Sequence, residues 1–202
     1  MGGDCFPNTK RLSEDEYNRI CGIITSWLEN HDFQFVIPVE VSDKKEICRS
    51  RGKDKPYGDV DVIVARNEKV KDENVAQLLI DVLDGRQDEI NKNDSTYSFL
   101  TKERYQVDIK FCKAKDLHFL GAFKGNNDFG ALLGHLLTPL QIKWSDSGLM
   151  LKLKKENVSG VGAVKADFLL SKNIPEICEF LGRDVFDDSV VSFLLRAFIT
   201  AG

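Results

Sequence analysis

The sequence predicts an α/β fold of the α+β kind, in which a mixed, largely antiparallel sheet has flanking helices and a small C-terminal extension. Two observations predict it. In several stretches of the 202-residue chain, apolar residues recur at the spacing of an amphipathic helix, and in others they alternate as in half-buried strands. We expect one main domain over residues 1–153, including an N-terminal helix, and an extension over residues 154–202.

Length and composition narrow the class of protein. With 42% apolar and 30% charged residues, the chain is long enough for one globular domain, alone or with a small appendage. No apolar run approaches the roughly 20 residues of a membrane span, and the N-terminus lacks the charged and apolar regions of a signal peptide. We therefore expect an intracellular protein, cytoplasmic or nuclear, with no membrane partner.

Cysteine usage and net charge argue against further classes. The five cysteines are odd in number and contain no Cys-x-x-Cys pair, which argues against a disulfide framework and against a zinc site. The net charge of −4 creates no field that attracts polyanions. A nucleic acid acceptor therefore fits the sequence only if local basic patches bind it.

Residues 14–30 are predicted to form the first helix. Ser13 and Glu16 have the spacing of a capping box, and apolar residues follow at helical spacing. Residues 33–41 are then predicted to form a strand. Pro38 restricts that strand to a sheet edge or divides it into two shorter pieces.

Residues 58–64, Gly-Asp-Val-Asp-Val-Ile-Val, are predicted to form a buried strand that two acids interrupt. Side chains two apart on a strand point to the same face, so Asp59 and Asp61 project together while the valines between and after them face a core. Two carboxylates this close repel each other unless a cation lies between them. Carboxylates completed by phosphate oxygens and water are the way proteins hold Mg²⁺.

Residues 42–57 are predicted to form a loop, because the segment is rich in charge and contains Gly and Pro; six of its residues are basic. A solvated surface loop explains this composition. The loop also lies directly before the acidic strand, where a triphosphate held through metal ions needs cationic and backbone N–H partners. It is not a Walker loop, because it lacks the Gly-Lys-Ser/Thr ending and an acidic pair follows it.

Further along the chain, a helix over residues 71–84 is predicted to end at Gly85. The polar stretch 86–94 is expected to be a loop. Residues 96–100 and 105–111 alternate as two strands of a hairpin.

A third acid, Asp108, lies in the middle of the strand predicted over residues 105–111. Its neighbours Val107 and Ile109 face the other way, as the valines beside Asp61 do. One such acid would fit a surface position on a half-exposed sheet. Three acids on two strands of the same pattern point to a shared site.

The remaining elements follow from the same periodicities. They are helices over residues 114–123 and 128–137, a hairpin of strands 140–144 and 149–153, a strand over 167–170, and helices over 175–181 and 193–199. A helix-hairpin-helix pattern at 160–166 is a weaker alternative to the loop that we expect there. The last helix ends abruptly, which would fit a fragment of a longer protein.

Together these segments resemble the nucleotidyltransferase fold, in particular the catalytic (palm) region of DNA polymerase beta and its family X relatives. The resemblance covers residues 48–153 and depends on Gly58–Asp61, on Asp108 and on the segment 123–130, Phe-Lys-Gly-Asn-Asn-Asp-Phe-Gly. It implies that Asp59, Asp61 and Asp108 are catalytic and hold two Mg²⁺ or Mn²⁺ ions. It also implies that Asp108 draws the proton from the attacking hydroxyl.

The resemblance further implies a set of nucleotide-binding residues. These are Arg49, Ser50, Arg51, Gly52, Lys53, Gly58, Gly125 and Asn126. The family has a Gly-Ser turn where this chain reads Cys-Arg-Ser-Arg-Gly, and a Thr-Gly-Ser segment where it reads Lys-Gly-Asn. Sugar selectivity is therefore not implied.

The function expected from the resemblance is Mg²⁺-dependent nucleotidyl transfer, in which a nucleoside monophosphate moves from an NTP or dNTP to an acceptor hydroxyl. A DNA end, an RNA end, a protein side chain and a small molecule are all open as acceptors. The alternative is a catalytically silent module of the same fold that binds a nucleotide or a protein partner.

Overall fold

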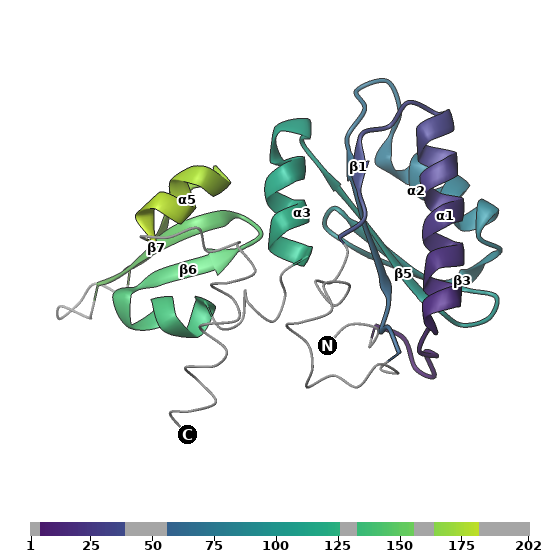
Figure 1. Cartoon of the computed structure of the whole chain (residues 1–202), viewed down its shortest axis with the longest axis horizontal. Helices are drawn as coiled ribbons and strands as arrows, with labels where there is room; N and C mark the ends of the chain where they lie inside the picture. Colours follow the sequence, from purple (N-terminus) through teal and green to yellow (C-terminus); the bar gives the residue numbers. More distant parts are fainter. Residues whose placement is uncertain (1–4, 39–55, 126–132, 156–163, 182–202) are drawn as a thin grey trace. The chain divides into compact units, whose positions relative to one another are not determined.

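The computed structural model describes residues 5–38, 56–125, 133–155 and 164–181 (Figure 1). The chain divides into two compact units, of which the first comprises residues 1–38 and 50–121 and the second residues 39–49 and 122–202. The predicted division was 1–153 and 154–202; residue 154 lies inside a strand, Gly148–Lys155, that pairs with the strand Val164–Ser171. Four predicted segments lie outside the described residues: the strand end 39–41, most of the basic loop, the helix start 128–132 and the helix 193–199.

The first unit is built on a five-stranded sheet in the order β1-β2-β5-β4-β3. Its strands are β1 (Phe35–Val36), β2 (Val60–Ala65), β3 (Gly85–Asn93), β4 (Thr96–Thr101) and β5 (Gln106–Cys112). β2 and β5 run parallel, and the other neighbours are antiparallel. The expected mixed, largely antiparallel sheet is thus confirmed.

Helix α1 (Glu14–Asn30) forms where the sequence predicts it. The Ser13 hydroxyl accepts from the Glu16 backbone N–H, and the Glu16 carboxylate accepts from the Ser13 N–H at 2.9 Å, so the capping box is complete. At the other end, His31 Nδ1 lies 2.7 Å from the Trp27 carbonyl oxygen. These local contacts fix both ends of the helix beside the sheet.

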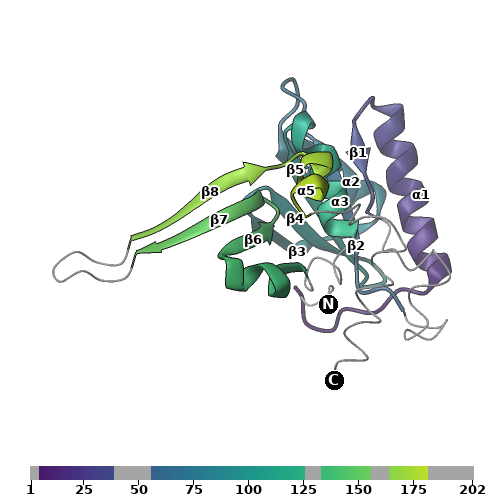
Figure 2. The ribbon, with the colours of Figure 1, turned by 60° about the vertical axis from the view of Figure 1, so that its left-hand side comes forward.

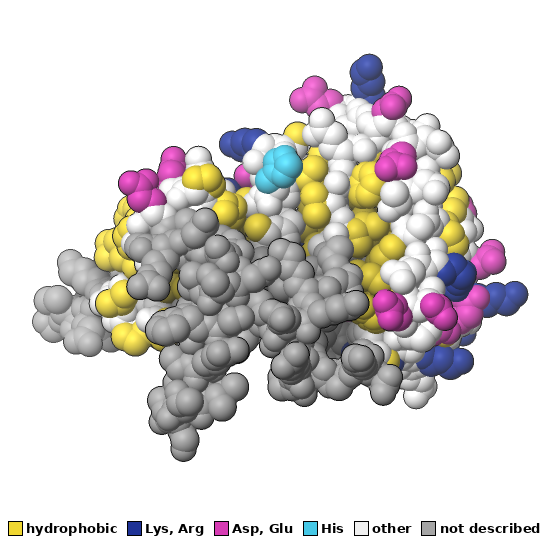
Figure 3. Space-filling view, viewed as in Figure 1, with side chains coloured by type: hydrophobic (Ala, Val, Ile, Leu, Met, Phe, Trp, Pro, Cys, Tyr) yellow, Lys and Arg dark blue, Asp and Glu magenta, His cyan; other side chains and the backbone are white. Residues whose placement is uncertain are grey.

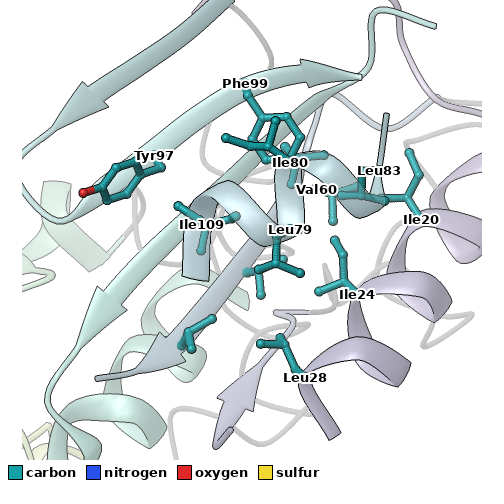
Figure 4. Packing of buried hydrophobic residues seen from close by; sticks show 14 of the residues in the cluster. Ile20, Ile24, Leu28, Val60, Leu79, Ile80, Leu83, Tyr97, Phe99 and Ile109 are labelled. Atoms are coloured by element: carbon teal, nitrogen blue, oxygen red, sulfur yellow. The ribbon is translucent and has the colours of Figure 1, made fainter. Parts of the chain in front are cut away.

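Helices α1 and α2 (Asp72–Val82) supply the apolar residues that cover one face of the sheet (Figure 4). From the sheet, the alternate residues of β2 and β5 point into this core, as their sequence pattern predicts. The fully buried members from these four elements include Ile20, Ile24, Leu28, Val60, Val62, Val64, Leu79, Val107 and Ile109. The residues between them on β2 and β5 therefore belong to the opposite face.

Helix α3 (Leu117–Gly125), which follows a 3-10 turn over Ala114–Asp116, contacts that opposite face at its edge. A Cβ added to Gly121 would lie 2.9 Å from Cγ1 of Val36, so the helix approaches β1 closely at a residue without a side chain. Val36 pairs with Ile63, and both project from the face opposite the α1 and α2 core. At Gly121, α3 thus lies against β1 on the same side of the sheet as Asp61.

One predicted loop is wrong, because residues 86–94 lie almost entirely in β3. The strand is the sheet edge and pairs only with β4, so most of its side chains are exposed and the polar sequence carries no apolar alternation. Gly85 does not end α2 either. Asp84 adopts the left-handed conformation with φ 49°, and Gly85 begins β3, where a Cβ would lie 2.6 Å from Cγ2 of Ile80.

The second unit contains a three-stranded antiparallel sheet in the order β6-β7-β8, seen in Figure 2. It comprises β6 (Ile142–Ser145), β7 (Gly148–Lys155), β8 (Val164–Ser171) and helix α5 (Ile174–Phe180). The predicted hairpin is confirmed, and the expected short strand at 167–170 is longer than predicted. Residues 164–166 belong to β8, and residues 133–137 are helical, as expected for the end of the second predicted helix.

Among the described cysteines, Cys5, Cys21 and Cys112 form no disulfide bond. Within the described ranges, no helix has both the length and the apolar character needed to cross a membrane.

Glu73 of α2 and Lys92 of β3 form an ion pair that predicts a measurable titration shift. Lys92 Nζ lies 2.6 Å from Glu73 Oε1 and 5.0 Å from the centre of the Tyr97 ring. The hydrogen bond from Lys92 is the main cause that lowers the pKa of Glu73 to about 2. We expect Lys92→Ala to return this pKa towards 4.5, measured by NMR titration of the Glu73 side chain. An unchanged pKa in Lys92→Ala would contradict the pair.

The sign of the linked stability follows from that shift. The carboxyl titrates at a lower pH in the folded chain than in the unfolded one, so its contribution is present above pH 4.5 and is lost as the pH falls towards 2. Both side chains are about half exposed, so the contribution is small. Lys102→Ala, in an exposed turn of the same unit, is the control that should leave the Glu73 titration unchanged.

Candidate active site

Asp61 of β2 and Asp108 of β5 lie directly opposite each other across the parallel strand pair. Neighbouring strands run about 4.8 Å apart, and paired residues of a parallel ladder project to the same face. The flanking pair of Val60 and Val107 faces the core under α1 and α2. The structure therefore brings these two of the predicted acids together on the face turned away from that core.

Both acids are partly exposed to solvent. Asp61 is the only residue of β2 that is partly exposed, and all its strand neighbours are buried. On β5 the partly exposed residues are Asp108 and Lys110. Two half-buried carboxylates on adjacent strands favour the binding of a cation, because their charges repel each other.

Asp59 and Gly58 lie just before β2, partly exposed, rather than inside the predicted strand. The chain leading to them is anchored, because the backbones of Leu12 and Tyr57 exchange two hydrogen bonds of 3.0 and 2.9 Å. The Tyr57 ring also stacks on Tyr17 of α1, with the ring centres 4.2 Å apart. The N-terminal segment and α1 thus hold the segment that carries the first acid.

The electrostatic influence of Asp61 extends to Tyr17. Burial is the main cause that raises the pKa of the Tyr17 phenol, and the nearby Cys21, Tyr57 and Asp61 raise it further. The phenol therefore remains protonated at neutral pH. It adds no negative charge near the acids.

Gln106 is a residue of this site that the sequence analysis missed. Its side chain is only 2% exposed, and its Nε2 donates to both carboxylate oxygens of Asp108, at 3.0 and 3.2 Å. Gln106 lies two residues before Asp108 on β5, so strand periodicity alone places it on the same face. On the other side of Asp108, Ser98 of β4 is its direct partner across the sheet.

Lys110 adds a cation to the same face. It follows Asp108 by two positions on β5 and pairs with Ile63 and Thr96 on the neighbouring strands. It is partly exposed. The face therefore presents a basic side chain beside the two acids. As with Gln106, the alternation of side chains along β5 is enough to place Lys110 on this face.

Other predicted site residues are not brought together by the described structure. Across the described parts of the chain, no three His, Cys, Asp or Glu side chains form a group that could hold a metal ion. Gly125 ends α3 and belongs to the second unit. The remaining predicted nucleotide contacts lie outside the described residues: Arg49, Ser50, Arg51, Gly52, Lys53 and Asn126.

The donor chemistry of the paired acids fits a hard divalent cation. Carboxylate oxygens are the protein ligands that Mg²⁺ prefers, and Mg²⁺ commonly takes only one or two of them, with phosphate and water completing its shell. The pair of Asp61 and Asp108, open to solvent on one side, meets that requirement with two ligands. Asp59 is the nearest further carboxylate in the sequence.

Comparison with known proteins identifies no relative of this chain. The chain matches no protein-family model and no curated protein sequence. The chemistry of the site therefore has to be inferred from its own residues.

Proposed function

We propose that the protein is an Mg²⁺-dependent nucleotidyltransferase that moves a nucleoside monophosphate from an NTP or dNTP to an acceptor hydroxyl, with pyrophosphate as the leaving group. The observation that carries the proposal is the in-register pair of Asp61 and Asp108 on the solvent-facing side of two parallel strands. The two acids come from segments far apart in the sequence, each within an apolar strand. The resemblance to family X polymerases supports the same assignment.

In this proposal each acid has a distinct task. Asp59 and Asp61 would hold the metal-bound triphosphate, and Asp108 would hold the catalytic metal ion and accept the proton of the attacking hydroxyl beside it. When bound, divalent cations neutralise the charge that develops on the attacking and leaving oxygens. Few other catalytic groups are then required, which fits the charged residues that β2 and β5 carry, two acids and one Lys.

The proposal does not specify which molecule supplies the acceptor hydroxyl. On the face of the molecule that Figure 3 shows, basic and acidic side chains of the described residues lie intermixed, and the net charge is −4. A nucleic acid end would therefore have to be bound by a local patch rather than by the overall field. A protein or small-molecule hydroxyl fits the described surface equally well.

The proposal is tested by binding and turnover measured together. Calorimetry with a nucleoside triphosphate should show binding that depends on Mg²⁺. A transfer assay over primed DNA, RNA and the protein itself should then identify an acceptor. Triphosphate binding that ignores Mg²⁺, together with no transfer to any acceptor, would contradict the proposal.

A silent binding module is the second candidate, and one observation favours it. Within the described residues, the acids do not form a group of three that could hold a metal ion. A module of this kind would bind nucleotide or a protein partner with little dependence on Mg²⁺. The calorimetric comparison with and without Mg²⁺ therefore separates the two candidates.

The basic loop gives a further prediction for the nucleotidyltransferase. We expect the triple change of Arg49, Arg51 and Lys53 to Ala to weaken triphosphate binding, because three cationic partners of the phosphates are removed. The loss should shrink at high salt, which screens exposed charges. The control is the triple change of Lys69, Lys71 and Lys102, exposed basic residues elsewhere in the first unit. Equal affinity of the loop variant and wild type would place the phosphate contacts elsewhere.

A further inference from the structure

The Gln106 side chain links the N-terminal segment to Asp108. Its Oε1 accepts from the backbone N–H of Cys5 at 3.0 Å, and its Nε2 donates to the Asp108 carboxylate. A backbone N–H can only donate, so Oε1 must face Cys5 and the amide N–H₂ must face Asp108. The contact with Cys5 thereby fixes which way round the amide lies.

The segment that provides this contact, residues 5–12 or the N-terminal strap, is itself held against the sheet. The Lys10 N–H donates to the Arg104 carbonyl at 2.9 Å. In turn, the Arg104 guanidinium donates to the carbonyls of Pro7 and Asn8, at 2.7 and 3.1 Å. Leu12 is fully buried and paired with Tyr57. The strap therefore holds the Cys5 N–H in a defined place.

We propose that Gln106 is a positioning residue for Asp108, with its amide oriented by the Cys5 backbone and its Nε2 holding the carboxylate in place. This inference rests on the proposed function. Gln106 does not touch the reacting atoms, and it acts only through the acid beside it.

The chemistry of the contact suits this role. A carboxylate has about four sites that accept hydrogen bonds or ligands, and the Gln106 amide occupies at most two of them. The amide is uncharged and does not compensate the negative charge that attracts that cation. Residues that orient a metal ligand in this way commonly change metal affinity or activity by about 10- to 100-fold when they are replaced.

Two substitutions test the proposal. Gln106→Met has a similar shape but lacks the donor, and Gln106→Glu keeps an acceptor for Cys5 while removing the donor to Asp108. We expect both to lower kcat by roughly 10- to 100-fold, with triphosphate affinity within a few-fold of wild type. Mn²⁺ binding by Gln106→Met, measured by electron paramagnetic resonance without nucleotide, should weaken by about tenfold.

The matched controls are Gln77→Met and Gln77→Glu. Gln77 also donates its Nε2 to an aspartate carboxylate, that of Asp81 at 3.0 Å, but on the exposed surface of α2. Both control variants should keep wild-type kcat and Mn²⁺ affinity. A Gln106→Met protein with a lower melting temperature but wild-type kcat and Mn²⁺ affinity would show a purely structural role and overturn the proposal.

The same measurements separate this inference from the proposed function. A wild-type protein that transfers nucleotide while the Gln106 variants match it refutes the positioning role alone. If wild type binds Mn²⁺ but transfers nothing, the function is refuted and the Mn²⁺ affinities decide the role of Gln106. Absence of both transfer and Mn²⁺ binding in wild type refutes both.

Discussion

Asp61→Asn is expected to abolish Mg²⁺-dependent triphosphate binding, and Asp59→Asn to do the same. Each change removes an anionic oxygen ligand from a site with very few of them. Calorimetric titration with a nucleoside triphosphate, with and without Mg²⁺, measures the effect. Asp88→Asn is the matched control, because it alters an exposed aspartate on the edge strand of the same sheet and should bind as wild type does.

The melting temperature of the metal-free Asp61→Asn protein tests the opposing interpretation, in which the Asp61 carboxylate has a structural role. Asp61 is partly exposed and faces away from the α1 and α2 core, opposite Asp108. Removing one of two facing negative charges should leave the melting temperature unchanged or raise it. A marked fall in the metal-free melting temperature would instead indicate that the Asp61 carboxylate holds the sheet together.

Asp108→Ala is expected to separate chemistry from binding. If Asp108 accepts the proton of the attacking hydroxyl, its loss should lower kcat by roughly 10²- to 10⁴-fold. Triphosphate affinity should remain within a few-fold, because Asp59 and Asp61 still hold the triphosphate. kcat and kcat/KM should fall together, as they do when an interaction made only in the transition state is removed.

Single-turnover transfer and equilibrium nucleotide binding, measured on the same variant, separate the effect on the chemical step from the effect on affinity. Ser98→Ala is a useful control, since Ser98 lies opposite Asp108 on β4 and its replacement changes the same neighbourhood without removing a carboxylate. It should leave kcat within a few-fold of wild type. Full activity of Asp108→Ala on the best acceptor would refute the assignment. A large loss of nucleotide affinity would instead indicate that Asp108 binds the triphosphate.

Much of the fold could be predicted because it is encoded locally. The capping box at Ser13 and the apolar spacing after it define α1 without knowledge of any partner. The alternation of β2 and β5 likewise identifies their core face. β3 could not be predicted in this way, because an edge strand with mostly exposed side chains needs no apolar alternation.

The candidate site was predictable only in part, for a similar reason. Acids within apolar strands mark Asp61 and Asp108 individually, but their register depends on how two distant strands pair. Gln106 was missed because its importance depends on a contact with Cys5, far away in the sequence. The pairing of β7 with β8 is likewise not evident from either strand alone.

The parallel pairing of β2 with β5 has a consequence for how the protein folds. Parallel neighbours cannot be joined by a tight turn, so α2, β3 and β4 are all traversed before β5 can align with β2. Such long-range pairings form slowly, because the chain loses entropy before the contacts compensate for it. A nascent or partly unfolded chain therefore has two separate carboxylates, and any ligand that requires both will bind and stabilise only molecules in which this pairing is complete.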